Sequence, residues 1–261
     1  MTPGKRDVSP NWQETAESDR LDRKTGALPT ERNGLPVENY SDRRGRFRIL
    51  DLFCCAGGAG MGYRRAGFEV VGIDIDRQPR YPFAFMQKDV TKLDRSFLRE
   101  FDAIHASPPC QRYSKAQRLR GREHPDLIDG TRAMLIESGL PYVIENVPGA
   151  PLIDPVTLCG SSFPELRVYR HRQFETNWRF VPPFMDCCGK HHPNQAKMGR
   201  PPRDGQFVHV VGNFSGVEYA RKAMGISWMS RDELREAIPP AFTECIGHQL
   251  IALLQMQRVA A

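Results

Sequence analysis

The sequence predicts a single α/β domain built on an open β-sheet, and three stretches carry this prediction. The apolar stretch 47–53 runs directly into the glycine-rich turn 54–63, which opens a helix. A second apolar stretch, 68–73, ends at Asp74, and a third, 103–106, runs into two prolines and a cysteine. Short apolar runs bounded by turn residues are typical of buried strands. Ligands of such sheets bind outside the carboxyl ends of the strands, so we expect functional residues there.

Length and charge limit the classes of protein that the sequence fits. The chain has 261 residues, which is enough for one α/β domain with a small appendage. Its 37 lysines and arginines outnumber 31 acidic residues and give a formal net charge of +6. This charge favours a polyanionic partner, although a mildly basic enzyme explains it equally well.

Cysteine usage and hydropathy predict the compartment. The seven cysteines include two adjacent pairs and lack the spacing of a disulfide-rich secreted module. No apolar run approaches the length of a membrane span, and the amino terminus has no apolar secretion segment. We therefore expect a cytoplasmic protein that has no membrane partner.

Residues 1–45 differ in composition from the rest of the chain. They are charged, mixed in sign and poor in clustered aliphatic residues, so they cannot offset the entropy of ordering. We predict a disordered or loosely attached arm. Four arginines at its end could contact phosphate, but a solvated approach to the first strand explains them more simply. They are Arg43, Arg44, Arg46 and Arg48.

The first two strand ends predict a nucleoside site. Gly57 and Gly58 let backbone amides approach a ligand at a helix amino terminus, although their spacing departs from the G-x-G-x-x-G pattern of dinucleotide sites. Asp74 is placed to accept hydrogen bonds from ribose hydroxyls, and Ile75 to pack on adenine. A third strand delivers Asp89 as a candidate for the adenine amino group. Each acid alone could be a helix cap, but their succession favours a nucleoside.

The stretch 107–114 is the most distinctive in the sequence. Pro108 and Pro109 remove backbone donors and fix φ, so the chain leaves the strand in a rigid, extended loop. Cys110 follows at once, where a thiol could act on a bound ligand. Most free cysteines are instead small buried apolar residues, so both interpretations of Cys110 remain open at this point.

Several motifs resemble those of the DNA cytosine-5 methyltransferase family and occur in the family's order. The resemblance extends from about Phe47 to Leu254, and the ordered set is more specific than any member alone. The motifs are Asp51-Leu52-Phe53-Cys54 with Gly57-Gly58, Pro108-Pro109-Cys110-Gln111, Glu145-Asn146-Val147, and Arg170-His171-Arg172.

The resemblance implies a Rossmann-like methyltransferase sheet with helices on both faces and a small irregular target-recognition insert. It also implies S-adenosylmethionine as cofactor and double-stranded DNA as substrate. The cofactor contacts that it implies follow the strand ends. They are Asp51, Phe53, Gly57, Gly58, Asp74, Ile75, Asp89 and Pro108.

The implied chemistry is transfer of a methyl group to cytosine C5. Cys110 attacks C6 of a base flipped out of the duplex. Glu145 engages N3, because C6 is a poor electrophile until N3 is protonated or hydrogen-bonded, and burial would raise the pKa of that carboxyl. Arg170 and Arg172 reach the flipped cytosine and support the nucleophile loop, where a guanidinium lowers the pKa of a thiol. Taken alone, an Arg-x-Arg pair is more often a surface feature.

A basic loop follows Cys110 and precedes a helix predicted over 126–138. We expect this loop to contact DNA phosphates and to close over an extruded base, with a solvent-exposed linker as the simpler alternative. The predicted DNA-contacting residues are Gln111, Ser114, Lys115, Arg118, Arg120 and Arg122.

Residues 178–224 break the periodic pattern, and the family's target-recognition region is inserted at this place. The segment is short, which indicates a briefly recognised target. Adjacent cysteines and adjacent histidines in one loop do not easily give a tetrahedral zinc site, so we favour packing and DNA contact there. The four residues concerned are Cys187, Cys188, His191 and His192.

The carboxyl-terminal residues are predicted to return to the first turn. Residues 238–247 resemble the family's last motif, although Glu236-Ala237 stand where the family usually has Gly-Asn. The helix 240–257 presents a core-facing apolar stripe. The predicted organisation is an arm over 1–45, a catalytic and cofactor-binding domain over 46–177, an insert over 178–224 and a returning segment over 225–261.

Three alternatives remain open. An RNA cytosine-5 methyltransferase acting on transfer RNA would keep the chemistry and change the substrate. A non-catalytic DNA-binding homologue would have lost the cofactor site, although intact Cys110, Glu145 and Arg172 argue against it. A Rossmann dehydrogenase gives no role to Pro-Pro-Cys-Gln. The compact insert fits a stand-alone, phage-like enzyme in a bacterial or phage-infected cell. We expect a monomer, and a cognate restriction nuclease is a further partner that the resemblance allows.

Overall fold

The computed structural model describes residues 31–32, 35–36, 45–113, 126–183, 194–197 and 200–260. The chain divides into two units, 1–43 and 44–261. In the first unit β1 (Glu31–Arg32) and β2 (Leu35–Pro36) pair antiparallel, and the rest of the predicted arm up to residue 44 lies outside the described residues. No helix in the described ranges is long and apolar enough to cross a membrane.

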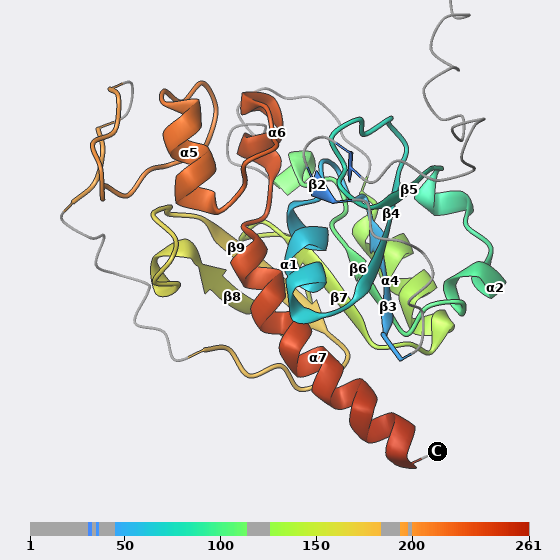
Figure 1. Ribbon diagram of the computed structural model, residues 1–261. Helices are drawn as coiled ribbons and strands as arrows, with labels where there is room; N and C mark the ends of the chain where they lie inside the picture. Colours follow the sequence, from blue (N-terminus) through green and yellow to red (C-terminus); the bar gives the residue numbers. More distant parts are fainter. Residues whose placement is uncertain are drawn as a thin grey trace, which may run out of the picture. The chain divides into compact units, whose positions relative to one another are not determined.

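The second unit is built on a seven-stranded sheet with the order β5-β4-β3-β6-β7-β9-β8 (Figure 1). Five neighbouring strands run parallel, and β9 runs antiparallel to both β7 and β8. The predicted Rossmann-like α/β fold class is therefore confirmed. The strands are β3 (Arg48–Leu52), β4 (Glu69–Asp74), β5 (Ala84–Gln87), β6 (Ala103–Ala106), β7 (Tyr142–Asn146), β8 (Val156–Cys159) and β9 (His171–Thr176).

Helices cover both faces of this sheet, as the sequence predicts (Figure 1). The helices α1 (Gly58–Ala66) and α7 (Pro240–Ala260) lie over one face, and α2 (Arg95–Leu98) and α4 (Ile128–Ser138) over the other. Ile49 of β3 belongs to the apolar cluster of α1 and α7, and the next residue, Leu50, to that of α2 and α4. Successive side chains of a strand point to opposite faces, so the central strands are buried on both sides.

Two predicted elements differ from the structure. The apolar residues over 93–101 have helical spacing and predict a helix, but only the short helix α2 forms, because Asp94 caps its start and the chain must enter β6 soon afterwards. The apolar run over 208–213 predicts a strand, but the structure has only one bridge there, between Val208 and Val168. The remaining short elements are η1 (Val90–Lys92), η2 (Gln111–Tyr113), η3 (Gly160–Ser162), α5 (Val217–Met224) and α6 (Arg231–Glu236).

The helices α1 and α7 meet at positions that admit no side chain. A Cβ atom at Gly62 would lie 2.1 Å from Pro240 O and equally close to Thr243 Oγ1. The Thr243 hydroxyl donates a hydrogen bond of 2.8 Å to Ala59 O, one turn earlier in α1. This contact holds the beginning of α7 against the glycine-rich turn.

We predict opposite effects of alanine at two helical glycines. Gly62→Ala should lower the free energy of unfolding by about 1 to 3 kcal/mol, because the new methyl group meets backbone atoms of α7. Gly130→Ala should raise it by about 0.4 to 1 kcal/mol, because that exposed glycine of α4 has open space around it. Urea unfolding measures both, and equal stability of the two variants would contradict the close contact.

Candidate active site

The ends of β6 and β7 are joined by the side chain of Asn146. Its Nδ2 donates a hydrogen bond of 2.9 Å to Pro108 O, and its Oδ1 accepts one from Val147 N. Cys110 follows as a half-buried free thiol, and Tyr113 N donates to its carbonyl within η2. The extended loop predicted from the two prolines is thus held to the neighbouring strand. Asn146 belongs to the Glu-Asn-Val motif, but the sequence did not indicate this role.

Glu145 and Arg172 form a buried ion pair beside this loop. Glu145 on β7 is 5% exposed, and its Oε1 lies 2.8 Å from Nε of Arg172 on β9. The N–H does not point at the oxygen well enough for a hydrogen bond, so Oε1 keeps its capacity to bond to a ligand. Burial raises the pKa of Glu145, while Arg172 and a hydrogen bond from the Ser107 side chain oppose that rise.

The pKa of the Cys110 thiol is raised, not lowered. Burial is the main cause and the charge of Glu145 adds to it. The guanidinium groups of Arg172 and Arg170 lower the pKa as expected, but their effect is the smaller one. The expectation of a thiolate prepared by a neighbouring arginine is therefore corrected, because desolvation outweighs the positive charge.

Arg170 binds backbone carbonyl groups, whereas Arg172 pairs with a carboxylate. Its side chain is buried, with Nη1 donating to Val210 O at 2.9 Å and Nη2 to Arg235 O at 2.7 Å. Only its Nε has no hydrogen bond. Arg170 therefore ties the start of β9 to two distant backbone segments, and its contact with a cytosine stays a prediction.

The turn between β3 and α1 is strained. Phe53 and Cys55 are not glycines, yet both have left-handed φ angles, of 56° and 44°. Such conformations cost free energy and cluster at ligand sites. Cys55 N donates to Asp74 Oδ2 at 2.9 Å, and Asp76 N donates to Oδ1 at 3.0 Å. The turn after β3 and the end of β4 thus form one unit.

The glycines of this turn are required by packing within the protein. A Cβ atom at Gly57 would lie 2.9 Å from the ring of Tyr81, and one at Gly58 would lie 2.5 Å from Ile238 O. From the sequence, both glycines are expected to allow close approach by a ligand. Contact of their backbone amides with a ligand stays a prediction. The positions that side chains would occupy at Gly57 and Gly58 are filled by Tyr81 and Ile238.

Asp51 lies beneath the turn. It is fully buried, its Oδ2 accepts a hydrogen bond of 3.1 Å from the Tyr81 hydroxyl, and its Oδ1 has no partner. Burial raises the pKa of Asp51 to about 8, so the carboxyl is mostly neutral at pH 7. Its predicted contact with a cofactor stays a prediction. Tyr81, which the sequence analysis did not single out, covers this carboxyl.

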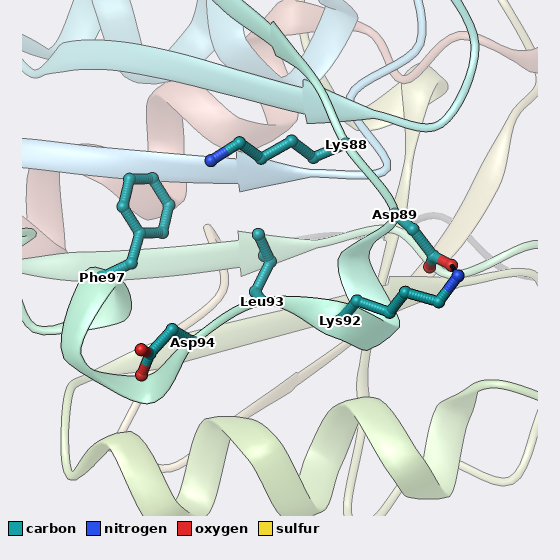
Figure 2. A pocket seen from close by; sticks show the side chains of 6 residues that line it. All are labelled: Lys88, Asp89, Lys92, Leu93, Asp94 and Phe97. Atoms are coloured by element: carbon teal, nitrogen blue, oxygen red, sulfur yellow. Dashed lines mark ion pairs between the residues drawn. The ribbon is translucent and has the colours of Figure 1, made fainter.

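Asp89 lines a shallow hollow of about 400 Å³ at the outer end of β5 (Figure 2). Its carboxylate accepts hydrogen bonds from Thr91 and pairs with Lys92 at 3.2 Å, and these contacts lower its pKa. The end of β5 lies beside β4, because Lys88 N donates to Asp74 O. Contact of Asp89 with an adenine amino group stays a prediction, because its oxygens already have partners within the protein.

The carboxyl-terminal segment closes on the same turn. Trp228 Nε1 donates a hydrogen bond of 2.7 Å to Ala56 O, and Arg80 pairs with Glu233 at 3.0 Å. Glu236, at the end of α6, is exposed, and its charge raises the pKa of the Cys110 thiol. The residue that departs from the family's last motif thus acts on the Cys110 thiol.

Some predicted residues cannot be placed. The side chain of Gln111 and all of Ser114, Lys115, Arg118, Arg120 and Arg122 lie outside the described residues, as do Cys187, Cys188, His191 and His192. Within the described ranges, no group of three or more His, Cys, Asp or Glu residues could hold a metal ion.

Part of the chain that carries this site is similar to a known family. Residues 47–150 match the family model of the C-5 cytosine-specific DNA methylases. This segment is therefore similar to that family, and it includes the strained turn, the ends of β3 to β7, Cys110 and Glu145.

The relatives match only part of their own length. The chain is 34% identical over 85 residues to the type II methyltransferase M.FnuDI of Fusobacterium nucleatum, covering 30% of this chain and 25% of that protein. It is 31% identical over 120 residues to M.NgoPII of Neisseria gonorrhoeae, covering 39% and 33%. The chain thus spans about a quarter to a third of the curated relatives that it matches.

Two solved structures share the fold. One is a candidate DNA modification methyltransferase encoded within an E. coli prophage, with a TM-score of 0.56 and 15% identity over 80% of this chain and 99% of that one. The other is the methyltransferase EhMeth of Entamoeba histolytica, with a TM-score of 0.54 and 12% identity over 81% and 99%. At these identities the likeness concerns the fold alone.

We predict that Asp51 makes the protein less stable as the pH rises. The folded state keeps a proton that the unfolded state releases above its ordinary pKa of 3.8, so the free energy of unfolding falls between pH 3.8 and about 8. Asp51→Asn keeps an oxygen for Tyr81 and removes the titration. From about pH 5 to about pH 8.5, the wild type should lose a few kcal/mol more than the variant in urea unfolding. Parallel pH dependences would contradict the raised pKa.

Proposed function

We propose that this protein transfers a methyl group from S-adenosylmethionine to C5 of cytosine in double-stranded DNA. The observation that carries the proposal is the meeting of Cys110, Glu145 and Arg172 at the ends of neighbouring strands, within a segment of the cytosine methylase family. A nucleophilic sulfur beside a carboxyl of raised pKa suits addition to a pyrimidine ring.

Each of these side chains has a chemical role in the proposal. The Cys110 thiol gives its proton to water and its sulfur bonds to cytosine C6, while Glu145 gives a proton to N3, so C5 gains electron density. C5 takes the methyl group as the bond between that carbon and the donor sulfur breaks. The proton on C5 then leaves to water, the C6–S bond breaks and N3 returns its proton to Glu145, which restores the ring and the thiolate. Arg172 holds the Glu145 carboxyl. The base must leave the stack, because C6 is inaccessible within the duplex.

The strand ends fit the proposed cofactor, which supplies an electrophilic methyl carbon on a positively charged sulfur. Each oxygen of Asp74 accepts one backbone N–H and can accept another hydrogen bond, as two ribose hydroxyls require. Ile75 is 61% exposed beside it, an apolar surface on which adenine can pack. Phe53 adds a strained backbone at the turn, which supports a ligand site there.

The proposed setting is the cytoplasm of a bacterial or phage-infected cell. The five cysteines within the described residues are all free thiols, which supports a reducing compartment. The net charge of +6 suits a DNA partner. A cognate restriction nuclease and a monomeric state stay predictions.

Cys110→Ala should reduce methyl incorporation into DNA by at least about a thousandfold, because no covalent bond to C6 can form. The matched control is Cys245→Ala, which removes a half-buried thiol of α7 and should methylate at close to the wild-type rate. DNA with 5-fluorocytosine at the target should form a covalent complex on a denaturing gel with the wild type and with Cys245→Ala but not with Cys110→Ala, since fluorine cannot leave C5 as a proton does. Wild-type methylation by Cys110→Ala would refute the mechanism.

Duplex DNA should accept radioactive methyl groups from S-adenosylmethionine, and unmodified transfer RNA should not. The two substrates are compared at equal cytosine concentration with the full chain, and Cys110→Ala gives the background. Bisulfite sequencing of DNA from expressing cells then locates the target. Incorporation into transfer RNA alone would overturn the DNA assignment while leaving the chemistry in place.

A further inference from the structure

A row of polar side chains, of which Tyr63 and His105 are buried, leads from α1 to Glu145. The Tyr63 hydroxyl of α1 lies 3.0 Å from His105 Nδ1 of β6, and His105 Nε2 lies 2.9 Å from Ser107 Oγ. Ser107 follows β6 where Glu145 lies near the end of β7, because Ala106 pairs with Ile144, and the Ser107 side chain acts on the Glu145 carboxyl as a donor that lowers its pKa. We call Tyr63, His105 and Ser107 the polar relay. Its members come from a helix, a strand and the loop before the nucleophile.

The histidine of the relay is neutral and has a single N–H to share. His105 is fully buried in an otherwise apolar strand, and this burial lowers its pKa to about 3. One ring nitrogen must therefore donate and the other must accept. Because each nitrogen has one partner, the partners of His105 decide its tautomer.

The hydrogen bonds of the relay can run in two directions. In the first, the Tyr63 hydroxyl donates to Nδ1, Nε2–H donates to Ser107, and Ser107 donates to the Glu145 carboxylate. In the second, a protonated Glu145 donates to Ser107, Ser107 donates to Nε2, and Nδ1–H donates to the Tyr63 hydroxyl. The Tyr63 hydroxyl then has no acceptor among the described contacts. A buried donor without an acceptor costs free energy, so the first direction is favoured.

We propose that Tyr63, His105 and Ser107 are positioning residues that orient the Glu145 carboxyl and stabilise its charged form through one directed row of hydrogen bonds. This inference rests on the proposed function, in which Glu145 must hold a proton for N3 and release it. The other groups that act on Glu145 are Arg172 and Arg170, from β9 and the residue before it.

The relay has a defined consequence for the pH dependence. Ser107 donates to the charged form of Glu145, so loss of the donor raises the pKa of that carboxyl further. If protonated Glu145 is the active form, the methylation rate falls as the pH rises through that pKa. A variant with a broken relay should keep its activity to higher pH. A purely structural defect would lower the rate at every pH and leave the profile in place.

The direct test is titration of Glu145 without substrate. The full chain is labelled with carbon-13 at the glutamate carboxyl carbons, and Glu145→Gln identifies the resonance by its loss. Ser107→Ala should raise the midpoint by about one pH unit, and Ser107→Thr, which keeps a hydroxyl, should restore it. Tyr63→Phe should raise it as well, because an unheld Nδ1 lets His105 accept from Ser107 and turn that hydroxyl away from Glu145.

Tyr142→Phe is the matched control. Tyr142 lies on β7 three residues before Glu145, but its side chain packs in the cluster on the opposite face. This variant should titrate like the wild type.

The proposal is refuted if Glu145 titrates with the wild-type midpoint in Tyr63→Phe or in Ser107→Ala. If Ser107→Ala does not fold, Tyr63→Phe decides alone. Because the titration needs neither DNA nor cofactor, its result is independent of the methylation assays. A protein without methylation activity can still show the relay, and an active one can still refute it. In an active protein, the pH above which the single-turnover methylation rate falls should be higher in Tyr63→Phe and Ser107→Ala than in the wild type. In Ser107→Thr it should return to the wild-type value.

Discussion

The ion pair between Arg172 and Glu145 depends on one antiparallel strand in an otherwise parallel run. The strand β9 pairs with β7 so that Phe174 lies opposite Glu145, and Arg172 shares the face of Phe174. A buried carboxylate without a positive partner is costly, so Glu145 requires the guanidinium that β9 brings. Arg170, the residue before the same strand, holds the backbone at Val210 and Arg235. The Glu145 carboxyl and the carboxyl-terminal segment are thus positioned by one strand.

The face of the sheet beneath α1 carries ionisable groups where an ordinary core carries aliphatic ones. Asp51 and His105 are register partners on neighbouring strands, and burial favours the neutral form of each. Hydrogen bonds from Tyr81 and with Tyr63 replace part of the lost water. A packed polar layer of this kind permits few arrangements, because every unpaired group is penalised. It connects the strained turn to Glu145.

Close backbone packing determines where the carboxyl-terminal segment can lie. The contact at Gly62 brings α7 onto α1, and Ile238 O rests where a side chain at Gly58 would stand. Trp228 then reaches Ala56 O with its indole N–H. Small residues in the turn therefore serve the closure of the fold, and Glu236 comes to act on the Cys110 thiol as a result of that closure.

The elements with local signals were predictable. The central strands are continuous apolar runs because both of their faces are buried, and the prolines before Cys110 set the loop by covalent geometry. The strand β9 gave no such signal. Its buried positions hold charged residues such as Glu175, which pairs with Arg132 of α4 at 2.8 Å. A charged residue in the sequence is typical of an exposed position, so its burial cannot be predicted until its partner from another element is known.

The sequence by itself determined the order of the strands along the chain, the glycine-rich turn, and the identity of Cys110 and Glu145 as the residues at two strand ends. These features follow from neighbours within a few residues. Only the tertiary structure decided which arginine meets Glu145, why the glycines are needed, and that burial outweighs positive charge at the Cys110 thiol. These outcomes depend on desolvation and on partners far away in the sequence, which no local pattern records.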